Sequence, residues 1–227
     1  GIHGSPTAVL AYDNAIGYLI GEENQGMRIM FNMMNSARLS VGVQGLAVAE
    51  RAYQDSVAYA KERKQGRMPG ASEDSFIIEF PDVRRMLLTQ KAYIAAMRRI
   101  MLLNAAYIDK MTNSPDEAVR ARAAEMEALL TPISKAFGSD LGNELVSLAM
   151  QIYGGMGYIE ETGAAQYYRD VRIAAIYEGT NGVQALDFVG RKMPVRMGQS
   201  FMEFIEEMKS VLPGLEAAGE DFASLHS

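Results

Sequence analysis

Apolar residues recur at helical spacing along most of the chain. Leu39, Val43, Leu46, Tyr53 and Val57 are separated by 4, 3, 7 and 4 positions. The same kind of spacing runs through four later segments: residues 83–101, 126–137, 141–152 and 201–212. Each series places one apolar stripe along one side of a helix. The pattern therefore predicts an all-α fold, an antiparallel up-down helix bundle in which these stripes meet.

Capping and turn-forming residues indicate where the first helices begin and end. The first helix is predicted from Gln25 to Glu62, before a polar stretch that contains glycine. Pro81 suits the first turn of the second helix, because the N–H that proline lacks has no helical partner there. Ser114 is predicted to cap the third helix, with Glu117 at the capping-box position.

The later part of the chain adds two more helices to the prediction. A fourth helix is predicted to begin near residues 139–140, and Pro194 and Pro213 bracket a last amphipathic one. The tail, residues 214–227, is small and acidic, and we expect it to be loose.

The first 24 residues differ in character from the rest. Residues 7–12 and 16–20 are short apolar runs on either side of Asp13 and Asn14, a pair typical of turns. They predict two short strands, a β remnant ahead of the bundle. The alternative is an irregular lead-in.

Composition excludes several classes of function. The chain has 227 residues, 48% of them hydrophobic, and no cysteine, so disulfides and thiolate nucleophiles are excluded. Its histidines, His3 and His226, lie at opposite ends, which argues against a Ser-His-Asp triad, and we predict no metal site. A net charge of -6 disfavours nucleic-acid binding. No apolar run approaches the roughly 20 residues of a membrane span. We expect a cytoplasmic protein and, without an initiator methionine, a fragment of a longer one.

Glu178 is the first candidate functional residue. It follows the apolar run 173–177 and precedes Gly179, Thr180 and Gly182. Glycines let a ligand approach the backbone, and a glutamate that faces a substrate can act as a general base. The alternative is an acid near a helix N-terminus that complements the helix dipole.

A second candidate is the glycine-rich segment 151–158. Gln151, Gly154 and Gly155 would end the preceding helix and offer backbone N–H groups to a cofactor. The alternative is a glycine C-cap followed by a loop. No strand pattern precedes the segment, so it is not a dinucleotide-binding fingerprint. Two open turns, one of them with an acid, predict a single cleft for cofactor and substrate.

Two arginines complete the candidates. Arg63 lies in a basic segment, residues 62–67, at the end of the first helix. Such cations favour a helix C-terminus, and the alternative is a clamp for a diphosphate. Arg38 lies in an apolar helical stretch, so it needs a partner, either an acid of the protein or a polar group of a substrate.

These motifs together resemble the C-terminal part of the acyl-CoA dehydrogenases. Residues 177–180, followed by Gln184, resemble the catalytic-base segment of that family, and residues 151–158 resemble its flavin-contacting loop. The match covers about residues 4–192 and is greatest for the larger branch of 3-methylmercaptopropionyl-CoA dehydrogenase type. It implies three parts: residues 1–24 as the tail end of a middle β-domain, 25–192 as the helical-bundle domain, and 193–227 as the start of a helical extension.

The resemblance also implies a mechanism. Glu178 takes the α-proton of an acyl-CoA thioester while the β-carbon gives a hydride to FAD, which leaves the 2,3-enoyl-CoA. The main-chain N–H of Glu178 holds the thioester oxygen, and Arg38 and Gly179 lie beside the substrate. Arg63 and Gln65 reach a flavin across a dimer interface. The residues expected to line the flavin are Gln151, Gly154, Gly155, Thr180 and Gly182.

The resemblance further implies a homo-oligomer, a dimer or tetramer, and an electron-transferring flavoprotein as the electron acceptor. Asn35 and Phe80 depart from the usual family residues, an acid and a histidine. Without upstream domains, the fragment is expected to be inactive and to bind FAD weakly. The alternatives are an acyl-CoA oxidase-like enzyme, a nitroalkane oxidase-like enzyme, which the glutamate disfavours, and a non-catalytic helical oligomerisation domain.

Overall fold

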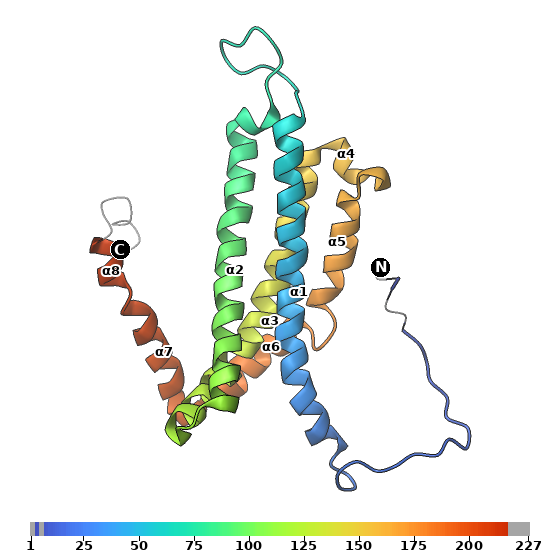
Figure 1. The fold of residues 1–227 in the computed structure, drawn as a ribbon, viewed down its shortest axis with the longest axis vertical. Helices are drawn as coiled ribbons and strands as arrows, with labels where there is room; N and C mark the ends of the chain where they lie inside the picture. The colour runs from blue at the N-terminus through green and yellow to red at the C-terminus, as the bar shows by residue number, and fades with distance from the viewer. Residues whose placement is uncertain (1–2, 5–6, 218–227) are drawn as a thin grey trace.

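Three long helices dominate the computed structural model, which describes residues 3–4 and 7–217 apart from the side chains of Asn32 and residues 215–217. They are α1 (Gly26–Glu62), α2 (Pro81–Asn113) and α3 (Glu117–Tyr153). Figure 1 shows them side by side, with the chain running up α1, down α2 and up α3. The predicted antiparallel helix bundle is confirmed.

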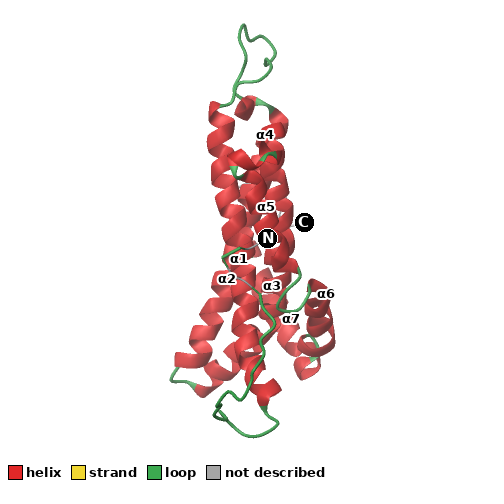
Figure 2. Cartoon of the chain, turned by 90° about the vertical axis from the view of Figure 1, so that its right-hand side faces the viewer, coloured by secondary structure: helices red, strands yellow, loops and turns green. Residues whose placement is uncertain are grey.

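Shorter helices cover the sides and ends of the bundle. The α-helices are α4 (Gly155–Tyr158), α5 (Ala164–Arg172), α6 (Asn181–Asp187), α7 (Gln199–Lys209) and α8 (Leu212–Ala217). Short 3₁₀-helices span Ile77–Glu79, Glu160–Thr162, Ile173–Ala175 and Val195–Gly198, and a π-helix spans Phe188–Lys192. Figure 2 shows α4 at the upper end of the bundle with α5 below it, and α6 and α7 beside the lower half. Within the described part of the chain, no helix is long and apolar enough to cross a membrane.

The core lies where the apolar stripes of α1, α2 and α3 meet. Met97 of α2, Val146 of α3 and Ala49 of α1 are all fully buried, and Val171 of α5 packs onto the same cluster. Burial of apolar surface on this scale supplies most of the free energy of folding.

Glycines bring α1 and α3 into close contact. A Cβ added at Gly138 would lie 2.7 Å from the carbonyl oxygen of Gly42, and one at Gly142 would lie 3.0 Å from Cα of Gly45. Both distances are too short for a side chain, so the backbones themselves meet. The predicted helix start near residues 139–140 is therefore wrong: Gly138 is a packing residue, and α3 continues through it.

The ends of the first helices agree with the prediction except for one cap. α1 ends at Glu62 as predicted, and Pro81 is the first residue of α2. The cap of α3 is Asp116, whose carboxylate accepts hydrogen bonds from the N–H groups of Ala118 at 2.8 Å and Val119 at 3.4 Å. The predicted cap, Ser114, instead accepts from the N–H of Asp116 and ends α2.

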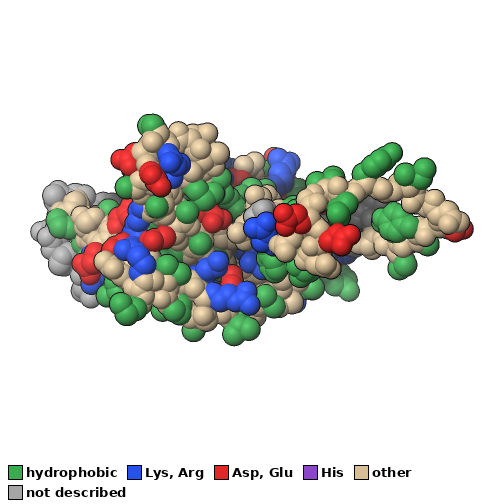
Figure 3. Space-filling model, turned by 90° about the horizontal axis from the view of Figure 1, so that it is seen from below, with side chains coloured by type: hydrophobic (Ala, Val, Ile, Leu, Met, Phe, Trp, Pro, Cys, Tyr) green, Lys and Arg blue, Asp and Glu red, His purple; other side chains and the backbone are tan. Residues whose placement is uncertain are grey.

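The two strands predicted in residues 7–20 are absent. Residues 7–20 have irregular backbone with exposed side chains, including Val9 at 101% and Tyr18 at 89% exposure. A strand needs a partner for its N–H and C=O groups, and no described segment pairs with these residues. Figure 3 shows apolar side chains along the arm that projects from the bundle. The irregular alternative therefore describes this segment of the chain.

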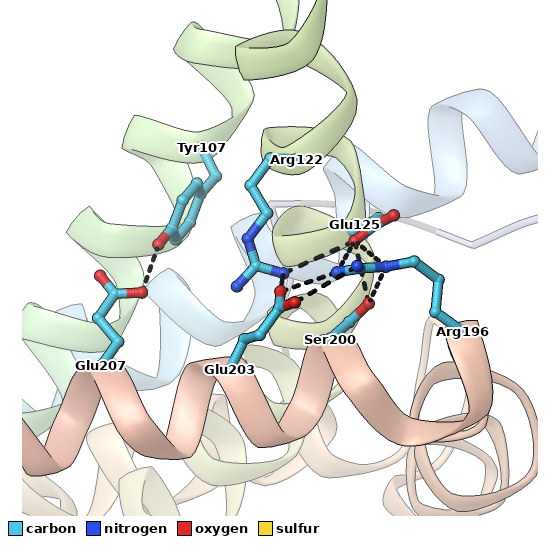
Figure 4. Close-up of polar contacts among 7 residues, drawn as sticks. All are labelled: Tyr107, Arg122, Glu125, Arg196, Ser200, Glu203 and Glu207. Carbon is cyan, nitrogen blue, oxygen red and sulfur yellow. Dashed lines mark hydrogen bonds and ion pairs between the residues drawn. The ribbon is translucent and has the colours of Figure 1, made fainter.

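The predicted last helix is α7, and it is anchored to α3 by both apolar and charged contacts. Phe201 and Phe204 pack against a buried cluster around Met126 and Leu130. Figure 4 shows the charged contacts, in which side chains of α3 and α7 surround the guanidinium of Arg196. Arg196 lies 2.8 Å from carboxylate oxygens of both Glu125 and Glu203.

Candidate functional site

Glu178 lies in a tight turn between the 3₁₀-helix Ile173–Ala175 and α6. Its φ is 57°, and that of Gly179 is 82°, so two successive residues are left-handed. That conformation is natural for glycine, but it costs a glutamate free energy that surrounding contacts have to offset. Thr180 caps α6, with its hydroxyl oxygen 3.4 Å from the N–H of Val183. The half-buried carboxylate therefore projects from a constrained backbone ahead of a helix, as predicted.

Two glutamines hold this turn from either side. The buried Gln184 donates through Nε2 to the carbonyl oxygens of Gly179 at 3.1 Å and Glu178 at 3.4 Å. The hydroxyl of Tyr177 donates to the carboxamide oxygen of Gln44 on α1. A Cβ at Gly179 would lie 2.9 Å from Nε2 of Gln184 and would displace that side chain, and the φ of 82° is strained for any residue but glycine, so a larger residue there would disturb the turn.

A buried lysine supports the start of α6. Lys135 of α3 is 0% exposed, and its Nζ donates to Oδ1 of Asn181 at 2.9 Å. Burial lowers the pKa of Lys135 to about 8, the nearby carboxylates of Asp140 and Glu178 act to raise it, and Arg38 acts to lower it. Lys135 is thus a desolvated cation directly beneath the turn that carries Glu178.

Arg38 pairs with an acid of the protein. Its Nη1 lies 3.4 Å from Oδ2 of Asp187, and both residues are buried at 8% exposure. Its Nε is buried and has no hydrogen-bond partner among the described residues. A Cβ at Gly179 would lie 3.8 Å from Nη2 of Arg38, so the guanidinium reaches the Glu178 turn from below. The sequence left two partners open for Arg38, an acid of the protein or a polar group of a substrate. The structure provides the acid, Asp187, and contact with a substrate stays a prediction.

A second group of predicted residues lies at the upper end of the bundle. Arg63, Gln65, Gln151 and Gly154 line one cavity of about 250 Å³. Nη2 of Arg63 donates to Oε1 of Gln65 at 3.4 Å. α3 ends at Tyr153, and Gly154 follows with a φ of 61° as its C-cap, as the sequence predicted. No atom lies within 4 Å of a Cβ added at Gly154 or at Gly155, so the backbone here is open to approach.

The two groups do not share a cleft within one chain. Arg38 and Arg63 are 25 residues apart on α1, which corresponds to about 37 Å along the helix. Lys135, beneath Glu178, and Gln151 are 16 residues apart on α3, or about 24 Å. The predicted single cleft is therefore wrong for one chain: Thr180 and Gly182 lie with Glu178, whereas Gln151, Gly154 and Gly155 lie with Arg63.

The sequence interpretation missed the polar residues beneath Glu178. Lys135, Ser139 and Gly142 follow one another at helical spacing on the side of α3 where Gly142 meets α1. A lysine on the same helix face as a residue that packs against another helix is expected to be buried, because surface lysines lie on the solvent-facing side of a helix. Asp187 could have been found as the acid that a buried Arg38 requires.

Known proteins share this architecture. The sequence of residues 24–193 matches the family model of the acyl-CoA dehydrogenase C-terminal domain. A 3-methylmercaptopropionyl-CoA dehydrogenase of Ruegeria pomeroyi is 48% identical over 96% of this chain, and a butyryl-CoA dehydrogenase of Syntrophomonas wolfei is 37% identical over 92% of it. This chain spans 37% and 36% of the length of those two relatives.

Solved structures agree with the sequence comparison. Butyryl-CoA dehydrogenase from Megasphaera elsdenii has a TM-score of 0.59 and 30% identity, over 75% of this chain and 39% of that protein. Caenorhabditis elegans ACDH-11, in complex with C11-CoA, has a TM-score of 0.75 over 88% of this chain and 32% of that protein. At 22% identity, the second likeness supports the fold alone. The fold is the helical-bundle domain of a flavoenzyme class. The chain belongs to the acyl-CoA dehydrogenase family.

Proposed function

We propose that this chain is the C-terminal helical domain of a cytoplasmic, FAD-dependent acyl-CoA dehydrogenase that converts acyl-CoA thioesters into 2,3-enoyl-CoA. The observation that carries the proposal is the constrained turn at Glu178, with a φ of 57° and the buried Gln184 beneath it. Such a turn holds one carboxylate in a fixed direction, which a general base needs. Because the chain belongs to the acyl-CoA dehydrogenase family, we take the substrate of this carboxylate to be an acyl-CoA thioester.

Glu178 acts at the α-carbon in this proposal. Its carboxylate removes the α-proton, and its main-chain N–H donates a hydrogen bond to the thioester oxygen as negative charge develops there. FAD, when bound, supplies the acceptor for the hydride that leaves the β-carbon. Gly179 keeps the backbone beside the base free of a side chain, and Arg38 places a positive charge beneath the turn.

The upper cavity has the chemistry that a flavin dinucleotide requires. Arg63 offers a guanidinium fork suited to a diphosphate, and the carboxamides of Gln65 and Gln151 offer further donors. Gly154 and Gly155 leave the backbone open beside them. At the lower site, the buried Oε1 of Gln184 has no hydrogen-bond partner among the described residues. Thr180 and Gly182 precede it by four and two positions in the same segment.

The separation of the two groups supports a homo-oligomeric site. An interval of about 37 Å along α1 keeps Arg63 away from the Glu178 of its own chain. We infer that Arg63, Gln65, Gln151 and Gly154 of one protomer serve the flavin whose other contacts are Thr180 and Gly182 of its partner. A dimer is the smallest assembly that meets this requirement.

The substrate and the electron acceptor are proposed from the relatives. The names of the two relatives, a 3-methylmercaptopropionyl-CoA dehydrogenase and a butyryl-CoA dehydrogenase, support a short acyl-CoA substrate. A structure of the electron-transferring flavoprotein of Acidaminococcus fermentans is among the similar ones, with 28% identity and a TM-score of 0.61. A caffeyl-CoA reductase–Etf complex subunit of Acetobacterium woodii is 31% identical. Both support an electron-transferring flavoprotein as the acceptor.

The test uses the complete reading frame that contains this chain, purified with FAD. Butyryl-CoA and 3-methylmercaptopropionyl-CoA are supplied separately, with an artificial electron acceptor, and enoyl-CoA is measured. Enoyl-CoA formation that requires the acceptor supports a dehydrogenase. Stoichiometric peroxide in air, without the acceptor, identifies an oxidase, and absence of product with every thioester contradicts the proposal.

A further inference from the structure

Lys135 occupies a position that packing alone does not explain. It is 0% exposed within α3, although taking an ammonium out of water costs several kcal/mol and an apolar residue would avoid that cost. Three charged groups act on it, namely Asp140 on α3, Arg38 on α1 and Glu178 in the turn. Arg38 is itself paired with Asp187 at the end of α6.

We propose that Lys135 is a positioning residue for Glu178, because its ammonium holds the side chain of Asn181 and thereby fixes the turn that carries the carboxylate. This inference rests on the proposed function of Glu178 as the base. Lys135 does not touch substrate in this arrangement; it acts through Asn181, the first residue of α6.

The hydrogen bonds around Asn181 assign this role to Lys135. Nδ2 of Asn181 donates to Oδ1 of Asp140 at 2.6 Å, so its Oδ1 faces Nζ of Lys135 at 2.9 Å. The hydroxyl of Ser139 lies 3.2 Å from the same oxygen, but a hydroxyl carries one proton, and the carbonyl oxygen of Lys135 is closer at 2.7 Å. Lys135 is therefore the main donor to Asn181.

Fixing Asn181 fixes Glu178 because only two residues separate them. The turn between them begins at Tyr177, which is bonded to Gln44 on α1, and ends at Asn181, which is bonded to α3. A left-handed glutamate persists only where its neighbours hold both ends of the segment. Loss of the Lys135 contact leaves Oδ1 of Asn181 without its main donor and leaves only the Nδ2 bonds to Asp140 and Ser139, so this end of the turn is loosened and the carboxylate gains freedom to move.

The test compares Lys135→Met with the unchanged flavoprotein, in its complete and FAD-loaded form. Methionine keeps the length and the packing of the side chain and removes its charge and hydrogen bond. Lys91→Met, at an exposed position on α2, is the matched control. We expect Lys135→Met to lower kcat roughly tenfold or more, with KM within about threefold, because a small misplacement of a reacting group is costly. Hydrogen exchange of the amides of residues 178–182 accelerates roughly tenfold.

A second variant shows whether the effect passes through Asn181. Asn181→Ala removes the acceptor together with the hydrogen bonds from Nδ2 to Asp140 and Ser139, so we expect losses at least as large as for Lys135→Met. The double variant then loses no more than Asn181→Ala alone, because the Lys135 contact is already absent in that variant. The urea midpoint of Lys135→Met stays the same or rises, since a desolvated cation has been removed.

Two results overturn the proposal. In the first, kcat and exchange at residues 178–182 do not change in Lys135→Met. In the second, the midpoint falls and exchange rises throughout α3, which identifies a purely structural lysine. If the unchanged flavoprotein oxidises no acyl-CoA, the proposed function fails, and the exchange measurement by itself decides whether Lys135 holds the turn.

Discussion

Nη1 of Arg38 lies 3.4 Å from Oδ2 of Asp187, and the exposed fractions of the two side chains are only 10% and 9%. Arg38 belongs to α1 and Asp187 to the end of α6, so the pair ties the segment after Glu178 to the first long helix of the bundle. A buried ion pair of this kind contributes less to stability than its charges suggest, but removal of one partner leaves the other charge buried and uncompensated.

Asp187→Ala is therefore expected to lower the free energy of unfolding by about 3 to 5 kcal/mol. Urea denaturation of this chain measures the loss, with Asp109→Ala, at an exposed position on α2, as the control. The double variant Arg38→Met with Asp187→Leu should recover most of the loss, because apolar residues replace both charges. A loss below about 1 kcal/mol for Asp187→Ala would indicate that Arg38 is well solvated.

The glycine contact between α1 and α3 gives a second prediction. In Gly45→Ala the new Cβ would meet the backbone of Gly138, so we expect a loss of about 1 to 3 kcal/mol from overpacking. Gly190→Ala is the control, because nothing lies within 4 Å of its added Cβ. Thermal unfolding of both variants checks the prediction. Equal midpoints would show that the two helices can separate at no cost.

The period of apolar residues predicted the bundle because α1, α2 and α3 bury one continuous stripe each. It failed next to Gly138, where a fourth helix was predicted to begin near residues 139–140 although α3 continues through this position. A glycine in a helical pattern can either end the helix or allow another helix to pack closely against it. Which of the two occurs here depends on Gly42 and Gly45, the glycines of α1 that pack against α3. That information lies about 90 residues away in the chain and has no local signal.

The candidate site was predicted in its parts but not in its arrangement. The motifs around Glu178 and Gln151 were recognised separately and then placed in one cleft. Their true separation follows from the unbroken length of α3, which the wrong helix start near residues 139–140 had hidden. Lys135 was missed because its alignment with Gly142 signals burial only once Gly142 is known to pack against α1, and the predicted helix start near residues 139–140 separated the two residues.

Lys135 also makes stability depend on pH. Burial lowers its pKa from 10.5 to about 8, so between these values the unfolded chain binds more protons than the folded one. The free energy of unfolding therefore rises with pH from about 8 to 10.5, by on the order of 3 kcal/mol from this group. Urea midpoints across this range, compared between the unchanged chain and Lys135→Met, isolate the effect. Parallel pH curves would contradict the lowered pKa.

The charged contacts of α7 should fail in acid. The hydrogen bond from Arg196 holds the pKa of Glu203 below its usual value, with Arg122 adding to the effect. A lowered carboxyl pKa gives stability that is present at neutral pH and lost as pH falls through the folded-state value. The protection of the α7 amides, meaning their exchange rate relative to the intrinsic rate of an unfolded chain at the same pH, should therefore fall as the pH is lowered from 7 to 3.

Glu203→Gln should give fast exchange in α7 already at pH 7. Glu206→Gln is the control, because Glu206 pairs with Lys209 within the same helix. Added salt should accelerate exchange in the unchanged chain toward that of Glu203→Gln, because these charges are partly exposed. Protection of the α7 amides that changes with neither pH nor salt would assign the attachment of α7 to the packing of Phe201 and Phe204 alone.

The most direct measurement is the rate of flavin reduction after rapid anaerobic mixing of the complete flavoprotein with butyryl-CoA or 3-methylmercaptopropionyl-CoA. Loss of a general base costs about 10²- to 10⁴-fold, so Glu178→Gln should slow the bleaching of the flavin by that factor while FAD stays bound. Unchanged bleaching in Glu178→Gln would mean that another group takes the α-proton, and it would contradict the role given to this carboxylate.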